Sequence, residues 1–176
     1  MAHNIKSKII YFILPVIILF SSCASLIPRN KLDNYNNRIE DNLSVYIYTF
    51  DLTYNVGVEN TNNSKWIACL KEELEKEFNS FNVNVDIKVI HPSIGTEPEK
   101  EYTENENNLI LSIRQESLEN FINYLSFSLV VTLKDNSINK EVWKAKVRSG
   151  IKKGSLSYAK STSGYIIKAL KKDGLL

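Results

Sequence analysis

Five stretches of the chain have the hydrophobic pattern of β-strands. The clearest is VNVDIKVI, residues 83–90, in which apolar and polar residues alternate strictly. Because successive side chains of a strand point to opposite faces, this stretch predicts a strand with one face toward solvent. The other stretches are rich in β-branched, aromatic and aliphatic residues, and they cover residues 43–50, 108–115, 127–133 and 141–148.

The last two of these stretches are predicted to form a hairpin. They are joined by DNSINK, residues 135–140, whose Asp, Asn and Ser are typical turn residues. In the returning strand, alternation places Val142 on the face opposite to Trp143, Ala145 and Val147.

Two further stretches repeat apolar residues at the three- and four-residue steps of an amphipathic helix. The first runs from Lys65 to about Ser80, and Ser64 is placed to cap it. The second runs from Ser155 to Lys172, with Gly174 just beyond its end as a stop signal. The stripes are Ile67, Leu70, Leu74, Phe78 and Phe81 in the first helix, and Ala159, Thr162, Ile166, Ala169 and Leu170 in the second.

The predicted order of elements is therefore β-α-β-β-β-β-α. Each helix has one apolar stripe and most strands have one apolar face. This pattern predicts an α+β fold in which two helices pack on one face of a mainly antiparallel sheet of about five strands. The chain is 43% hydrophobic, enough to build the core of one domain, which we assign to residues 43–176. Residues 24–42 have no clear period and contain Pro28, so they predict a flexible tether.

The N-terminal region has a different pattern. Ile9 to Phe20 is an almost unbroken apolar run, shorter than the ~20 residues that a helix needs to span a bilayer. Lys6 and Lys8 precede the run and small residues follow it, which is the layout of a secretory signal peptide over residues 1–22. A buried N-terminal helix or an uncleaved anchor is the alternative interpretation.

Cys23 follows the apolar run in the stretch Phe20-Ser21-Ser22-Cys23. This stretch resembles the lipobox of bacterial lipoproteins, although Phe20 stands where Leu is usual. The resemblance implies cleavage before Cys23, diacylation of its thiol and a lipid anchor in the cell envelope, with residues 23–42 as lipid attachment and tether. Two or three acyl chains anchor a protein stably, whereas one binds marginally. Ala24 after the cysteine resembles the pattern of lipoproteins sorted to the outer membrane, where we expect the domain to face the periplasm.

The predicted domain is also similar to several small envelope lipoproteins. The likeness lies in the order of elements behind a lipidated cysteine and, for the second family named below, in LVVTLKDNSINKEVWKAKV, residues 129–147, and IIKALKKDGLL, residues 166–176. The families are the lipopolysaccharide-transport accessory lipoprotein and the N-terminal α/β domain shared by curli-secretion-type lipoproteins and the translocation protein TolB. The resemblance supplies no catalytic residue.

Charge is distributed unevenly along the chain. Without residues 1–22, Lys+Arg falls to 22 − 2 = 20 against 20 Asp+Glu, which argues against a nucleic-acid binder. Residues 23–133 carry 9 basic and 17 acidic residues, whereas residues 134–176 carry 11 basic and 3 acidic. The basic residues are either ordinary solvated charges or a face that meets anionic headgroups or an acidic partner. That candidate face consists of Lys134, Lys140, Lys144, Lys146, Arg148, Lys152 and Lys153.

No set of residues predicts catalysis, a metal site or a cofactor. His91 stands alone before a proline, and the glutamates of residues 97–106 lack the glycine and ligand spacing of an EF-hand. Ser157 and Lys160 match S-x-x-K, but the partner motifs S-D-N and K-T-G are missing. Residues 150–155 contain glycines before a helix without the G-K-[ST] of a phosphate loop.

The remaining cysteine and aromatic residues favour structural roles. Cys69 lies beside the stripe of the first helix and is predicted to be a small buried hydrophobe, or to pair with Cys23 if that thiol is not lipidated. Five aromatic residues either line a groove or belong to the core: Trp66, Trp143, Tyr46, Tyr48 and Tyr54.

Three hypotheses for function remain. We favour a non-enzymatic, lipid-anchored envelope protein whose domain binds an unidentified envelope protein, lipid or glycan. The alternatives are a lipid- or glycan-binding module of a transport system, and a hydrolase that uses Ser157.

Overall fold

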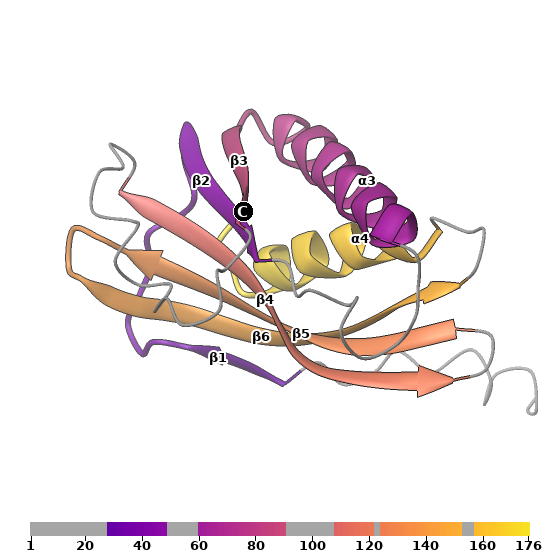
Figure 1. The fold of residues 1–176 in the computed structure, drawn as a ribbon. Coiled ribbons are helices and arrows are strands. Elements are labelled where there is room, and N and C mark those ends of the chain that lie inside the picture. Colours follow the sequence, from indigo (N-terminus) through magenta and orange to yellow (C-terminus); the bar gives the residue numbers. More distant parts are fainter. Residues whose placement is uncertain (1–27, 49–59, 91–107, 122–123, 153–156) are drawn as a thin grey trace, which may run out of the picture.

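The computed structural model describes residues 28–48, 60–90, 108–121, 124–152 and 157–176. In these ranges it is an α+β fold of one six-stranded sheet and two helices (Figure 1). The strands are β1 (Arg29–Lys31), β2 (Asn42–Tyr48), β3 (Asn84–Ile90), β4 (Leu109–Phe121), β5 (Tyr124–Asp135) and β6 (Lys140–Lys152). The helices are α3 (Asn60–Asn79) and α4 (Ser157–Lys172). None of the helices in the described part of the chain is both long and apolar enough to cross a membrane.

The sheet is mixed, with the strand order β1-β6-β5-β4-β2-β3. Strands β4, β5 and β6 form an antiparallel meander, and β1 adds to it antiparallel to β6. Strand β2 runs parallel to both β3 and β4. Both helices lie over the same face of the sheet (Figure 1). The predicted α+β class with two helices on one face is confirmed, while the sheet has one strand more than expected.

The parallel pair β2–β3 follows from the helix between them. A connection between neighbouring parallel strands must cross from one end of the sheet to the other, and a helix of 20 residues provides that crossover. Strand β2 lies inside the sheet because it pairs with β3 on one side and β4 on the other, and six of its seven residues are buried. Its apolar composition fits burial on both faces better than the alternation expected of a strand with one wet face.

The core lies between the sheet and the two helices. The predicted stripe residues Leu70, Leu74 and Phe78 of α3 are fully buried, as are Ile166 and Leu170 of α4. They belong to one continuous cluster with side chains of every strand from β2 to β6. Removal of this apolar surface from water is the main force that holds the helices on the sheet.

One detail of the predicted alternation is wrong. The pairing of β5 with β6 shifts between Leu133 and Lys134, which leaves one extra residue, Val142, on β6. Val142 and Trp143 are both buried in the same core cluster instead of pointing to opposite faces. A bulge of this kind breaks the two-residue period of a strand, so alternation alone cannot predict it.

Residues 28–41, which we call the N-terminal strap, are bound to the folded body. The Lys146 amide donates a hydrogen bond of 3.1 Å to the Pro28 carbonyl, and the Ile39 amide donates one of 2.8 Å to the Leu175 carbonyl. Tyr35 and Ile39 are buried in the core. The expected tether of residues 24–42 therefore differs from the structure in its described part, because backbone pairing and two apolar side chains fix the strap.

Candidate functional site

The outer face of the sheet, opposite the helices, carries a row of basic side chains. Lys144, Lys146 and Arg148 occupy alternate positions of β6, so they share one face and follow one another at about 7 Å. Their partners in β5 are Thr132, Val130 and Ser128, and Lys134 follows on the same strand face. All four cations are exposed. We call Lys134, Lys144, Lys146 and Arg148 the outer basic row.

Two acidic residues neutralise only part of this row. Lys144 pairs with Glu141 at 3.9 Å, and Lys146 pairs with Glu116, the extra residue of a bulge in β4. These four side chains are between 44% and 53% exposed, so water and salt screen both pairs. Among the described residues, Lys134 and Arg148 have no ion pair. Counting the described residues alone, the row keeps an excess of positive charge.

A hollow adjoins the row at the edge of the sheet. It has a volume of about 240 Å³ and is open to solvent. Its walls come from the strap, the β4 bulge and the row: Pro28, Arg29, Asn30, Glu116, Val130, Lys144, Ala145 and Lys146. Charged side chains of both signs line it together with the apolar residues Pro28, Val130 and Ala145.

The other residues of the predicted basic face are not part of this row. Lys140 lies at the hairpin end, in register with Asp135. Lys152 is the last residue of β6, but its side chain lies outside the described part of the structure, as do Lys153 and the predicted lipidation site Cys23.

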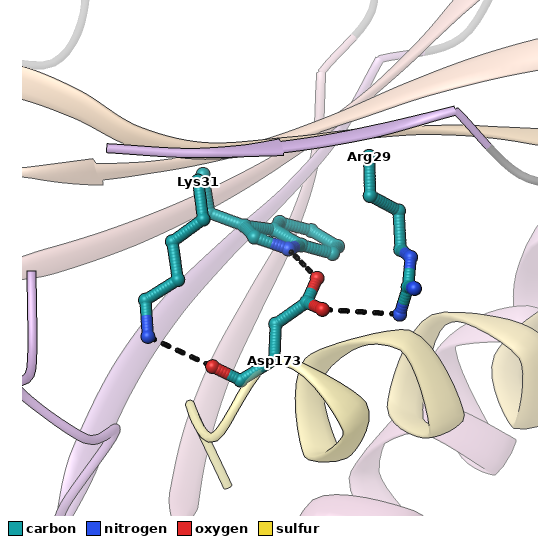
Figure 2. Close-up of polar contacts among 4 residues, drawn as sticks. Arg29, Lys31 and Asp173 are labelled. Atoms are coloured by element: carbon teal, nitrogen blue, oxygen red, sulfur yellow. Dashed lines mark hydrogen bonds and ion pairs between the residues drawn. The ribbon is translucent and has the colours of Figure 1, made fainter. Parts of the chain in front are cut away.

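A cluster around Asp173 fixes the strap beside the row (Figure 2). The Asp173 carboxylate pairs with Arg29 at 3.1 Å and accepts a hydrogen bond of 2.7 Å from the buried Trp143 indole. Lys31 donates a hydrogen bond of 2.8 Å to the Asp173 carbonyl. Gly174 follows with a φ of 72°, the left-handed conformation expected of the predicted helix stop. The end of α4 thus holds both ends of β1, and nothing in the hydrophobic pattern predicted this cluster.

Tyr35 and Asp135 form a second link between the strap and the sheet. The Tyr35 hydroxyl donates a buried hydrogen bond of 2.9 Å to Asp135, whose other oxygen accepts bonds from the Ser137 amide and hydroxyl. Burial, followed by the bond to Asp135 and its charge, raises the pKa of Tyr35 to about 12. Burial opposes ionisation of Asp135, but the donors from Ser137 and Tyr35 outweigh it and hold its pKa below the usual value.

The outer face is apolar rather than basic over β2 and the start of β4. Tyr46, Tyr48 and Ile110 are buried there as a separate cluster. The Arg114 guanidinium lies 4.5 Å from the centre of the Tyr48 ring and donates a hydrogen bond of 3.3 Å to its hydroxyl. The groove hypothesis for these tyrosines is not supported, because their rings are buried. Trp66 and Trp143 are core residues, and Tyr54 lies outside the described residues.

Among the described residues, the candidates for catalysis or metal binding do not form a site. Ser157 and Lys160 are both exposed on the first turn of α4, while His91 and the glutamates of residues 97–106 lie outside the described residues. Within the described ranges, no group of three or more His, Cys, Asp or Glu is placed to hold a metal ion. Cys69 is a half-buried thiol packed against the core. Burial and the nearby Glu73 and Glu72 raise its pKa, so it is a weak nucleophile.

Comparison with known proteins gives structural similarities only. No family model and no curated protein sequence matches the chain. A variant of the PelC dodecamer from Paraburkholderia phytofirmans is similar over 82% of this chain and 97% of that chain, at 13% identity and a TM-score of 0.48. The lipoprotein GNA1162 from Neisseria meningitidis is similar over 76% of this chain and 96% of that one, at 13% identity and a TM-score of 0.40. A minor lipoprotein from Acinetobacter baumannii covers 77% and 95%, at 10% identity and a TM-score of 0.37.

Proposed function

We propose that this chain is a lipid-anchored protein of the bacterial cell envelope, with Cys23 as the acylated residue. The observation that carries the proposal is the position of Cys23, directly after a short apolar run and two serines. A diacylated cysteine would hold the domain on a membrane without a spanning helix. The outer membrane, with the domain in the periplasm, is the location that Ala24 favours.

The second part of the proposal is a binding role without catalysis. The outer basic row and the adjoining hollow form an open, charged surface on a rigid sheet, which suits recognition of an anionic component of the envelope. Ser157 and Lys160 lie on the helix side, on an exposed turn, so the surface we assign to binding does not include the pair that the hydrolase hypothesis needs.

The anchor is tested with a pair of cysteine variants. The wild-type chain and Cys69→Ser are expected to incorporate labelled palmitate and to yield a mature form that starts at residue 23. Cys23→Ser is expected to incorporate no label and to keep its signal segment. Because the chain has two cysteines, Cys69→Ser is a matched control for the loss of a thiol. Equal labelling of the two variants would contradict the proposal.

The binding role is tested with a photo-crosslinking residue placed at Lys134 on the outer face and, as a control, at Lys168 on the exposed side of α4. Crosslinks to one envelope component from position 134 but not from position 168 are expected. The same products from both positions would mean that the outer face has no specific partner.

A further inference from the structure

We infer that the outer basic row lies against the anionic headgroups of the membrane that holds the anchor. The inference deepens the proposed function and rests on it, because it takes the membrane attachment at Cys23 as given. It assigns a partner to the row: the headgroup layer of a bilayer with anionic lipids. The argument uses the length of chain between Cys23 and the sheet, the point where the chain joins the sheet, and the charge found there.

The chain between the anchor and the folded body is short. Pro28 is hydrogen-bonded to Lys146, so only residues 24–27 separate Cys23 from the sheet. Five residue steps reach at most about 18 Å in any conformation, because a fully extended chain advances ~3.3–3.6 Å per residue. A tether up to residue 42, as the sequence suggested, would allow nearly four times that reach. The strap therefore keeps the sheet close to any membrane that holds Cys23.

The attachment point is beside the basic row. The hydrogen bond between the Lys146 amide and the Pro28 carbonyl puts Pro28 next to the middle of β6. Pro28, Lys144 and Lys146 line the same hollow. The Asp173 cluster holds β1 in this place through Arg29 and Lys31, as Figure 2 shows. The chain therefore leaves the body at the edge of the sheet beside the row, one residue before Arg29, whose side chain reaches the end of α4.

The charge of the row fits this orientation. Lys134 and Arg148 are exposed and, within the described residues, unpaired with any acid, while Lys144 and Lys146 have only screened partners. Cations attract anionic headgroups only within about a Debye length of the surface. The short connection brings the row into that range, whereas α4, which also carries lysines, lies across the sheet.

The test anchors the protein chemically, so that it does not require the cell to acylate Cys23. A chain that starts at Cys23 keeps the whole core, whose members lie between Tyr35 and Leu175. In a Cys69→Ser background, Cys23 is coupled to a maleimide phospholipid in vesicles of phosphatidylcholine with or without phosphatidylglycerol. A fluorescent amino acid at position 134 or 168 then reports proximity to a quencher on the lipid headgroups.

Stronger quenching at position 134 than at position 168 is expected in the anionic vesicles. The ratio of molecules with the row on the membrane to molecules in other orientations should rise about five-fold for each cation that contacts headgroups. The stronger quenching at position 134 should be lost in a row variant that combines Lys144→Gln, Lys146→Gln and Arg148→Gln. The control is a helix variant with the fluorescent residue at position 134, and its quenching should be unchanged. It combines Lys160→Gln, Lys168→Gln and Lys172→Gln. Insertion of about fifteen Gly and Ser residues before Pro28 should reduce the excess of quenching at position 134 over position 168, because the longer linker loosens the connection to the membrane.

Equal quenching at the two positions, or stronger quenching at position 168, would overturn the inference. A preference for position 134 that persists in neutral vesicles or in the row variant would also overturn it, because charge would then not be the cause. Neither result depends on palmitate labelling in cells, so a failure of the proposed anchor and a failure of this inference are distinguishable.

Discussion

The two faces of the sheet differ in burial and in charge. The helix-covered face is closed by one continuous apolar cluster, in which side chains such as Leu111 and Leu133 are fully buried. The outer face of β5 and β6 is polar, charged and open, and its ion pairs are half exposed. Neighbouring residues of one strand therefore differ in their surroundings, since one packs in the core and the next is exposed on the outer face.

The strap connects the two faces. Arg29 and Lys31 point to the end of α4, whereas Asn30 between them is in register with Lys144 of the outer row. The three residues of β1 therefore contact the end of α4 on one face and the outer basic row on the other. The comparison of the faces can be tested with substitutions that are adjacent in sequence or matched in chemistry.

The largest difference is expected between two neighbours in β5. Leu133→Ala should lower the free energy of unfolding by about 2–5 kcal/mol, because Leu133 is fully buried and its truncation leaves a cavity. Lys134→Ala, on the exposed outer face, should change it by less than about 0.5 kcal/mol. Urea unfolding measures both values, and similar losses would refute the assignment of the two faces.

The next largest effect is expected at the Asp173 cluster. Asp173→Ala removes the acceptor of the buried Trp143 indole and the partner of Arg29, and should cost about 1–3 kcal/mol. The control is Asp86→Ala, which removes an ion pair of 3.5 Å with Lys88 between side chains that are more than half exposed, and should cost about 0.5 kcal/mol or less. If thermal unfolding shows that Asp173→Ala and Asp86→Ala lose the same stability, the cluster does not hold the strap.

A smaller, pH-dependent effect is expected at Tyr35. Tyr35→Phe should cost about 1 kcal/mol near neutral pH, because buried Asp135 loses one donor. The native pKa of about 12 lies above the ordinary value of 10.0, so the folded state retains the Tyr35 proton longer than the unfolded state. Wild-type stability from this group is complete below pH 10 and falls as the pH rises toward 12.

The variant lacks this proton, so the stability difference from wild type should narrow between pH 10 and 12. Tyr165→Phe, on the exposed side of α4, is the matched control and should be close to neutral throughout. Urea unfolding at several pH values measures the curves. A constant difference across this range would show that Tyr35 does not carry the raised pKa.

The smallest effect is expected for the ion pair of Lys146 and Glu116 on the outer face. A double-mutant cycle with Lys146→Ala and Glu116→Ala should give a coupling energy between about 0 and 1 kcal/mol that decreases with added salt. A larger coupling that resists salt would mean that the outer face contributes to stability as the helix side does, and the contrast between the faces would be lost.

The sequence predicted the regular elements well where a single period ran through them. The stripe of α3 at Leu70, Leu74 and Phe78 and that of α4 at Ile166 and Leu170 both lie in the core as expected. The five predicted strands agree with β2 to β6 to within a few residues, except where β4 and β6 extend further than their hydrophobic patterns. Both extensions pair with the first residues of β5, one on each side, and need backbone hydrogen bonds rather than apolar residues.

The candidate surface was only partly predictable. The four residues of the outer basic row share one face, because alternate positions of a strand do so by geometry. The exclusion of Lys140 required the register and the bulge at Leu133, which depend on tertiary packing. The contact of Arg114 with Tyr48 has no signal in the sequence, since one cation within an apolar strand does not reveal its neighbour.

By itself, the sequence determined the two amphipathic helices, most strands and the unusual position of Cys23, because these depend on local order along the chain. Only the tertiary structure decided the parallel pairing of β2, the strand β1 and the cluster at Asp173. A strand of three residues has no period, and an ion pair between residues 29 and 173 has no local signal. The length of the connection from Cys23 to the domain therefore became known only from the folded chain.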